Sequence, residues 1–174
     1  MAHFARQFVH IDWQPTEFAA GHSGPESKPH DLDEVFSSIA SHARGLTNVR
    51  PPLEVDASDS SWGAMVEDQS YDAVFVSKVL HIAPYHTTQG VLAGAARVLA
   101  PEGRLFIYGA FTVNGKHSSP RNQAFDARLR EQSAEWGVRD SVEIATLAKN
   151  TFGLKLTASI AMPDDDMLLI FDRD

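Results

Sequence analysis

Residues 71–109, YDAVFVSKVLHIAPYHTTQGVLAGAARVLAPEGRLFIYG, decide the fold class. Tyr71 to Ser77 is a nearly continuous apolar, β-branched and aromatic run, which is typical of a strand covered by helices on both faces, so we expect a central strand there. The apolar residues of Thr87 to Leu99 share one helical face and predict a helix. The turn Pro101-Glu102-Gly103 then leads into a second strand, Arg104 to Gly109, and the three elements form a βαβ unit with parallel strands.

The chain before this unit predicts shorter elements. Phe8 to Trp13 alternates in hydrophobicity and stops before Pro15, which indicates a short strand. Ala19 to Pro29 is expected to be a loop. Asp31 is a predicted cap for a helix that Gly45 ends. Leu53 to Val55 predicts a short strand, and residues 60–66 predict a single helical turn of uncertain type.

The chain after Gly109 predicts a loop, two helices and a hairpin. Ala110 to Ser119 is polar and is expected to be a loop, and Pro120 is a suitable first-turn residue for a helix that ends near Glu135. Asp140 and Glu143 resemble a capping box for a second helix that stops at Gly153. Two apolar runs flank Pro163-Asp164-Asp165-Asp166 and predict an antiparallel hairpin. The whole order indicates one α/β domain over residues 1–174, doubly wound, with an antiparallel strand at one edge of the sheet.

Composition narrows the function classes. The formal net charge is −8 and the isoelectric point is about 5.4, so the surface offers no basic field for nucleic acid or anionic membrane, and a small-molecule ligand fits better. The absence of cysteine excludes disulfides, thiolate metal sites and a cysteine nucleophile, and it weakly favours an intracellular location. No apolar run approaches the roughly 18 residues of a spanning helix. The first residues also lack a signal-peptide pattern.

The carboxyl ends of the predicted strands indicate where a ligand binds, because ligands of doubly wound sheets lie beyond those ends. Glu17 follows the first strand, where a carboxylate can accept two hydrogen bonds from a ribose diol; the alternative is a solvated loop acid. Asp56 can accept from an adenine amine or cap the short helix after it. His81 follows the central strand and can donate to a ligand, act as a base or only pack.

Several chemistries find no support in the sequence. It contains no Gly-x-Ser-x-Gly turn and no Ser-x-x-Lys pair, so nucleophilic hydrolysis is disfavoured. A nicotinamide dehydrogenase needs Gly-x-Gly-x-x-Gly after its first strand, and no such run is present. No two-histidine helical pair with a carboxylate occurs, which makes a zinc site a weak hypothesis.

Motifs along the chain resemble the methyltransferase-like 26 family, also catalogued as domain of unknown function 938. They include Trp13-Gln14-Pro15-Thr16-Glu17, Asn48-Val49-Arg50-Pro51-Pro52, Asn114-Gly115-Lys116, Trp136-Gly137-Val138-Arg139-Asp140 and Ala161-Met162-Pro163. The resemblance covers essentially residues 3–174. It implies a class I S-adenosylmethionine-dependent methyltransferase fold, a Rossmann-like three-layer sandwich whose mostly parallel sheet ends in a reversed hairpin.

The resemblance also implies site residues. Glu17 would bind the ribose hydroxyls of S-adenosylmethionine, Asp56 and Ala57 the adenine edge, and Ser77 with the segment to His81 the adenosine. Tyr108, Asn114, Asn122 and Arg139 could line the side of the methyl acceptor, with loop and helix capping as an equally weighted alternative for each. Methyl transfer from a sulfonium is an in-line displacement that needs alignment and a place for a proton, so no dedicated nucleophile is required.

The sequence departs from the family pattern in three places. The family carries a Gly-rich loop after its first strand, and here Met1 stands inside the helix that would follow that loop, so the chain is expected to lack the first strand and the loop. The strands at Phe8 and Tyr71 would then lose a shared neighbour, and the unpaired edge would favour self-association. Asp164-Asp165-Asp166 replaces an Ala-Asn-Asn-like turn, and Ala110 stands where proline is common.

The alternative function is a non-catalytic remnant that acts as a protein-interaction module.

Overall fold

The computed structural model describes residues 2–18, 31–65 and 71–173. The chain divides into two compact units, Met1–Asp56 and Ala57–Asp174. The loop expected over Ala19 to Pro29 lies outside the described residues. The prediction of one domain over the whole chain stays a prediction.

The first unit contains two helices and a two-stranded parallel sheet. Its elements are α1 (Ala2–Gln7), β1 (Thr16–Glu17), α2 (Leu32–His42) and β2 (Leu53–Glu54), with β1 paired to β2. Helix α2 confirms its predicted start, because Asp31 accepts a hydrogen bond from the Asp33 amide at 3.0 Å. Gly45 follows the helix with a φ of +80°, a left-handed conformation that favours glycine.

The strand predicted over Phe8 to Trp13 is wrong. The segment turns after α1, and the strand β1 begins only at Thr16, although Trp13 makes an isolated bridge to Val49. The buried side-chain amide of Asn48 explains the difference, because it donates to the carbonyls of Ala5, Phe8 and Ile11 at 3.0, 3.2 and 3.0 Å. These bonds satisfy carbonyls that a strand would pair with a neighbour.

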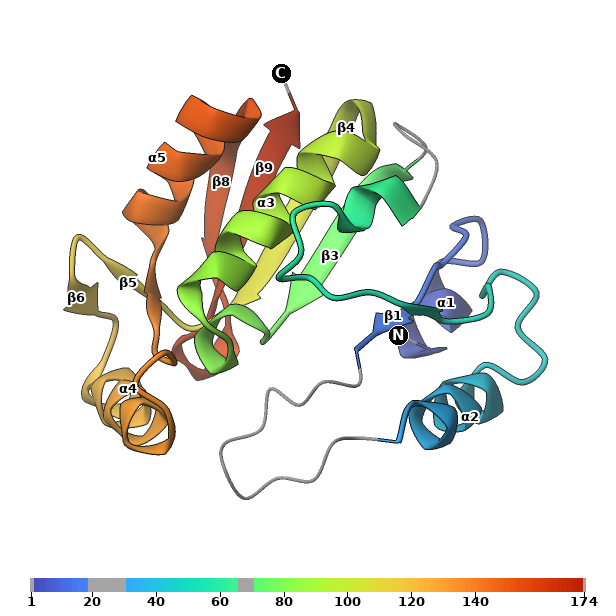
Figure 1. Cartoon of the computed structure of the whole chain (residues 1–174), viewed down its shortest axis with the longest axis horizontal. Helices are drawn as coiled ribbons and strands as arrows, with labels where there is room; N and C mark the ends of the chain where they lie inside the picture. The colour runs from blue at the N-terminus through green and yellow to red at the C-terminus, as the bar shows by residue number, and fades with distance from the viewer. Residues whose placement is uncertain (1, 19–30, 66–70, 174) are drawn as a thin grey trace. The chain divides into compact units, whose positions relative to one another are not determined.

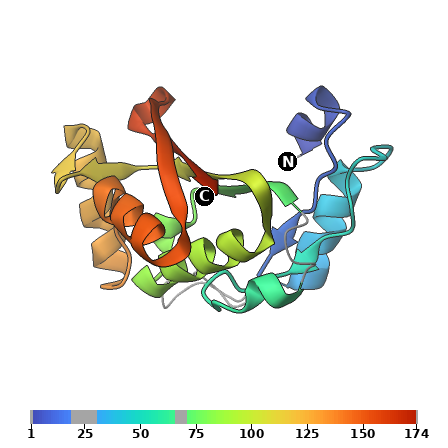
Figure 2. The same ribbon diagram turned by 90° about the horizontal axis from the view of Figure 1, so that it is seen from above.

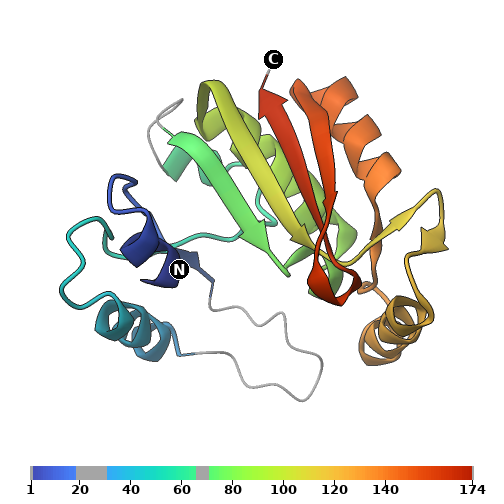
Figure 3. The ribbon, with the colours of Figure 1, turned by 180° about the vertical axis from the view of Figure 1, so that it is seen from behind.

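The second unit confirms the βαβ prediction. Strand β3 (Tyr71–Ser77) and strand β4 (Leu99–Gly109) pair in parallel, and helix α3 (Tyr85–Val98) connects them. The predicted hairpin is also confirmed: β8 (Leu154–Ala161) and β9 (Met167–Arg173) are antiparallel and flank the short helix η3 (Pro163–Asp165). The sheet order is β3-β4-β9-β8, so the reversed strand β9 lies against β4 (Figures 1 and 3).

Two details of this sheet differ from the expectation. Strand β3 is not central but stands at one end of the four-stranded sheet, and Phe75 is 48% exposed. Only β3 and β4 are parallel, so the sheet is mixed and its mostly parallel character is not confirmed. The turn expected before Arg104 lies within β4 as an irregularity of register, where Glu102 has a φ of 65°.

Helices α3 and α5 (Ser141–Phe152) lie on the same face of the four-stranded sheet, as the view from above shows (Figure 2). Their apolar residues and those of β4 and β9 form the main core, in which Leu92, Leu105, Ile144 and Phe171 are buried. Side chains alternate between the two faces of β4, so Leu105 and Ile107 lie on the same face of the strand and both point into the core. The described elements of this unit show an α/β fold, and a third layer is not confirmed.

The polar segment after β4 is not a simple loop. It contains the hairpin of β5 (Phe111–Val113) and β6 (Lys116–His117), and β7 (Arg139–Asp140) pairs in parallel with β5. The turn between β5 and β6 is Asn114-Gly115, with φ angles of 51° and 73°. Asn-Gly between two short runs is a strong hairpin signal, so the sequence did contain this information.

The remaining elements are α4 (Pro120–Gln132), η1 (Trp62–Met65) and η2 (Leu80–Ile82). Helix α4 begins at Pro120 as predicted, and its cap Ser119 accepts from the Asn122 amide at 3.2 Å. Within the described part of the chain, no helix has the length and apolar character needed to cross a membrane.

Candidate functional site

The carboxyl ends of β3 and β4 lie side by side because the two strands are parallel. Ser77 pairs with Tyr108, and the Lys78 amide donates to the Tyr108 carbonyl at 2.8 Å. The Lys78 ammonium lies 2.6 Å from the buried carboxylate of Asp166, a contact that raises the pKa of Lys78. A hydrogen bond to Asp166 likewise raises the pKa of Tyr108. Lys78, Tyr108 and Asp166 thus form one charged cluster at the edge where ligands of such sheets bind.

His81 lies in η2, directly after this edge, and only 6% of it is exposed. Its ring packs edge-on against Phe125 with 5.3 Å between the ring centroids, and its carbonyl accepts from the Gly137 amide at 3.0 Å. Burial lowers the pKa of His81, and the positive charge of Lys78 adds to that effect. His81 is therefore a packed histidine whose pKa is lowered, and a role in cofactor binding stays a prediction.

A cavity of about 310 Å³ lies within the second unit, next to the β5–β6 hairpin. Its lining comes from α3, the hairpin, α4, β7 and the first turn of α5. The lining residues are Tyr85, Thr112, Gly115, His117, Asp126, Arg130, Val138, Arg139, Asp140 and Glu143. The volume is at the lower end of the range for small-molecule sites.

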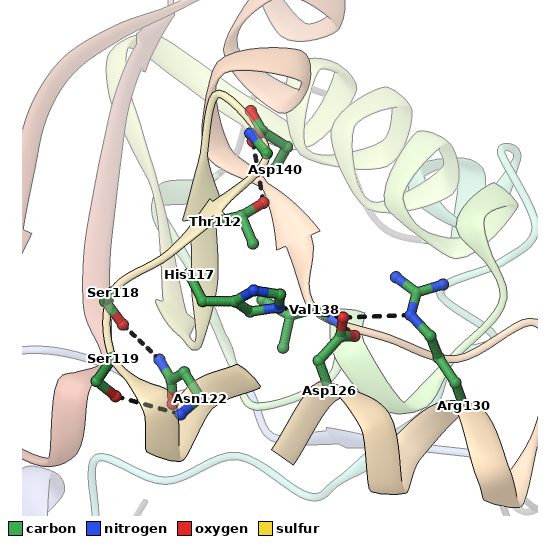
Figure 4. A network of polar contacts seen from close by, with 10 residues as sticks. Thr112, His117, Ser118, Ser119, Asn122, Asp126, Arg130, Val138 and Asp140 are labelled. Carbon is green, nitrogen blue, oxygen red and sulfur yellow. Dashed lines mark hydrogen bonds and ion pairs between the residues drawn. The ribbon is translucent and has the colours of Figure 1, made fainter. Parts of the chain in front are cut away.

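Asp126 is the centre of the polar contacts on one wall of this cavity. Its carboxylate accepts from the Val138 amide at 2.7 Å, from His117 Nε2 at 3.1 Å and from Arg130 Nε at 3.2 Å (Figure 4). Burial opposes ionisation of Asp126, but these three donors outweigh burial and hold the pKa of the carboxyl group below its ordinary value. Asp126 is therefore an ionised acceptor at neutral pH.

Asp140 organises the opposite end of the cavity. Its Oδ2 atom accepts from the Thr112 hydroxyl at 2.9 Å and from the Gly115 amide at 2.7 Å, while Oδ1 caps α5 through the Val142 and Glu143 amides. Burial again opposes ionisation, and the four donors lower the pKa of Asp140 on balance. One carboxylate thus joins the hairpin turn to the start of a helix.

Arg139 connects the cavity to the segment that follows β3. Its guanidinium donates to the carbonyls of Leu80, Ala83 and Glu135, and it lies 5.7 Å from the centroid of the Tyr85 ring. The carbonyls of Leu80 and Ala83 belong to η2 and to the loop after it, and that of Glu135 belongs to the segment between α4 and β7. Arg139 therefore fixes the position of the segment that follows β3 relative to β7.

The predicted acceptor-side residues take different positions. Arg139 lines the cavity, whereas Tyr108 belongs to the cluster with Lys78, and Asn114 forms the hairpin turn. Asn122 is buried, and its amide donates to the Ser118 hydroxyl at 2.7 Å and to the Asp165 carbonyl at 2.9 Å. Figure 4 shows the contact with Ser118 at the start of α4, where it holds the loop before the helix. A role of Asn122 toward a methyl acceptor stays a prediction.

The predicted cofactor residues are distributed over both compact units. Glu17 ends β1 with an exposed side chain whose Oε1 accepts from the Phe18 amide at 3.0 Å. Its other carboxylate oxygen has no partner within the described part of the chain, which fits a residue that accepts from a ribose diol. Asp56 ends the first unit and is half-buried. Ala57 packs against the core of the second unit, and Ser77 is exposed at the end of β3.

Several residues of the cavity are not among the predicted site residues, chiefly Thr112, His117, Asp126 and Arg130. His117 and Asp126 come from separate elements and are nine positions apart, so no local spacing relates them. The Asn114-Gly115 turn is the one signal that predicts the hairpin carrying Thr112 and His117. Within the ranges that the structure describes, no group of three or more His, Asp or Glu side chains could hold a metal ion.

Solved structures of other proteins share this fold. An O-methyltransferase family protein from Burkholderia thailandensis is 18% identical with a TM-score of 0.74, and the match covers 99% of this chain and 47% of that protein. The mitomycin 7-O-methyltransferase MmcR is 16% identical with a TM-score of 0.70, and the match covers 100% of this chain and 45% of MmcR. CalO1, a methyltransferase of calicheamicin biosynthesis in its SAH-bound form, is 15% identical with a TM-score of 0.66, and the match covers 98% of this chain and 44% of CalO1.

The chain spans less than half the length of these three proteins, and identities this low establish the fold alone. A family model gives the stronger comparison. The model of DUF938, described as a protein of unknown function, matches residues 1–173. The chain therefore belongs to the DUF938 family.

Proposed function

We propose that this chain is an S-adenosylmethionine-dependent methyltransferase of the methyltransferase-like 26 type, with a small molecule as its methyl acceptor. The observation that carries the proposal is the arrangement β3-β4-β9-β8, in which the reversed strand β9 lies against the second strand of a βαβ unit. Proteins with the same fold include O-methyltransferases and a methyltransferase with SAH bound. A Rossmann-like three-layer sandwich and an intracellular location are part of this proposal.

The residues at the carboxyl end of β3 are the proposed contacts to the cofactor in the second unit. Ser77 is exposed there, and its hydroxyl can donate to or accept from a nucleoside. The segment from Lys78 to His81 follows directly, and the Lys78–Asp166 contact fixes its start. In the first unit, Glu17 is the proposed ribose ligand, since its second carboxylate oxygen has no partner among the described residues, and Asp56 is proposed to contact the adenine. Methyl transfer needs the acceptor to be aligned and its proton to be removed, which the protein supplies through positioned polar groups.

Two substitutions test these assignments. Glu17→Gln removes the charge of the proposed ribose ligand, and Ser77→Ala removes the proposed hydroxyl. We expect each change to weaken the binding of S-adenosylhomocysteine, by about tenfold for Glu17→Gln, because hydrogen bonds to a charged group contribute roughly 1.5–3 kcal/mol. Calorimetric titration measures the affinities. Glu131→Gln, on the exposed side of α4, is the matched control. An unchanged affinity removes the substituted residue from the proposed site.

A protein-interaction module without catalytic activity is the second candidate function. One observation favours it: Phe8, Val9 and Ile11 are 44%, 72% and 40% exposed in the first unit. Three apolar side chains within four residues are typical of a contact surface. This candidate becomes the better account if the folded chain binds no S-adenosylhomocysteine.

A further inference from the structure

The hydrogen bond between His117 and Asp126 fixes which nitrogen of the imidazole carries a proton. Asp126 is ionised and can only accept, so His117 Nε2, 3.1 Å away, must donate. In the neutral imidazole the other nitrogen, Nδ1, then holds a lone pair. Within the described residues Nδ1 has no hydrogen-bond partner, and His117 lines the cavity. The cavity thus contains a hydrogen-bond acceptor, His117 Nδ1, and the bond from Nε2 to Asp126 fixes the orientation of its ring.

Both aspartates of the cavity and Arg139 already make hydrogen bonds within the protein. Asp126 has three donors and Asp140 has four, while Arg139 donates to three carbonyls. The charge of Asp126 is balanced by Arg130, so this wall offers no net charge to a ligand. A neutral ligand that donates a hydrogen bond to His117 therefore suits this wall.

The size and remaining lining of the cavity restrict the ligand further. A volume of about 310 Å³ corresponds to about ten waters of liquid, which suits a molecule with a single ring. Val138 and the ring of Tyr85 supply apolar lining. Figure 4 shows the imidazole of His117 between Thr112 and Asp126, so the donor of the ligand approaches next to the hairpin.

We propose that this cavity is the methyl-acceptor site and that it binds a small hydroxylated ring compound, such as a phenol, whose hydroxyl donates to His117 Nδ1. This inference rests on the proposed methyltransferase function and names its substrate class. It gives Asp126 the role of a positioning residue, because Asp126 acts on the ligand only through the imidazole.

The same geometry provides a place for the proton of the acceptor. The hydroxyl oxygen of the acceptor forms a bond to the methyl carbon while the carbon–sulfur bond of the sulfonium donor breaks, and the bonding electron pair stays on sulfur. The hydroxyl proton moves to His117 Nδ1. The resulting imidazolium is stabilised by the Asp126 carboxylate and later releases a proton to water. Charge and atoms balance without another reactant.

Phenol and anisole form a matched pair of probes, since anisole has the same ring but cannot donate a hydrogen bond. We expect phenol to shift the imidazole nitrogen resonances of His117 in the ¹⁵N-labelled chain and to bind in the millimolar range, and anisole to leave these resonances in place. Asp126→Asn presents an amide N–H to His117 Nε2 and reverses the tautomer, so the preference for phenol over anisole should disappear. His117→Phe keeps the ring shape, removes both nitrogens and should abolish the preference as well.

His86→Phe is the matched control, because His86 is an exposed histidine on α3 outside the cavity lining. Circular dichroism checks the fold of each variant, and His117→Phe decides the test if Asp126→Asn fails to fold. Equal shifts with both probes, or no shift at His117, overturn the proposal. Titration of S-adenosylhomocysteine separates the two claims: cofactor binding without a phenol response at His117 refutes only this inference, and a phenol response without cofactor binding refutes the methyltransferase function.

Discussion

Two glycines on α3 leave room for close neighbours, Gly94 for the indole of Trp62 and Gly90 for the backbone of Ala57 and Ser58. The indole N–H donates to the Gly90 carbonyl at 2.9 Å, and a Cβ atom on Gly94 would overlap the Trp62 ring. A glycine inside a helix normally costs about 1 kcal/mol relative to alanine, so packing has reversed the usual preference here. These glycines show why helix propensity alone does not explain the sequence of α3.

Gly94→Ala should therefore destabilise the protein, by about 1–3 kcal/mol, because overpacking outweighs the gain in helix propensity. Urea unfolding followed by circular dichroism measures the change in the free energy of unfolding. In a Trp62→Ala background the same substitution should be neutral or stabilising, since the obstructing ring is gone. A similar loss of stability in both backgrounds would show that contact with Trp62 is not the cause.

The contacts of single site residues could not be predicted from the sequence. Arg139 was predicted on the acceptor side and does line the cavity, but its guanidinium is bonded to backbone carbonyls. His117 and Asp126 form the proposed acceptor contact, yet their hydrogen bond depends on how the hairpin packs against α4. Such long-range contacts leave no periodic pattern in a sequence.

At the scale of elements, local sequence signals were sufficient to predict a helix or strand where the capping residues and the hydrophobic periodicity indicated the same element. Asp31, Ser119 and Asp140 cap α2, α4 and α5, and two antiparallel strands flank the predicted turn near Pro163. The predictions failed where tertiary contacts decide the outcome. Asn48 holds the segment after α1 out of a strand, and a run that is apolar enough for a central strand lies at one end of its sheet.

Asp140 joins two elements, so its removal should affect both. In Asp140→Asn one oxygen still caps α5, but an amide N–H₂ faces the Thr112 and Gly115 donors, and we expect a loss of about 1 kcal/mol at pH 7. The folded state lowers the pKa of Asp140, so its stabilisation is present above the unfolded value of about 3.9 and is lost as the pH falls through the folded value.

The difference between Asp140→Asn and the unchanged chain should accordingly shrink in acid. Thermal unfolding between pH 7 and pH 3 measures it, with Glu131→Gln as a control because Glu131 is an exposed carboxylate of α4. A difference that stays constant over this range would mean that the charge of Asp140 contributes nothing.

At the scale of the whole molecule, the sequence predicted the α/β class and the reversed hairpin, because each depends on the order of elements along the chain. It could not predict the division into two compact units, which depends on contacts between distant residues. The family match over residues 1–173 agrees with the resemblance to domain of unknown function 938 that the motifs indicate. The methyltransferase proposal therefore rests on the topology of the second unit and on the fold that it shares with methyltransferases.

Calorimetric titration of S-adenosylhomocysteine into this chain, with circular dichroism to establish that the chain is folded, tests the central claim most directly. The account predicts saturable binding with one site per chain and an affinity in the micromolar range, near −8 kcal/mol at about 1 µM. A folded chain that produces no binding heat at millimolar ligand and no change in thermal stability would contradict the claim that this protein is an S-adenosylmethionine-dependent methyltransferase.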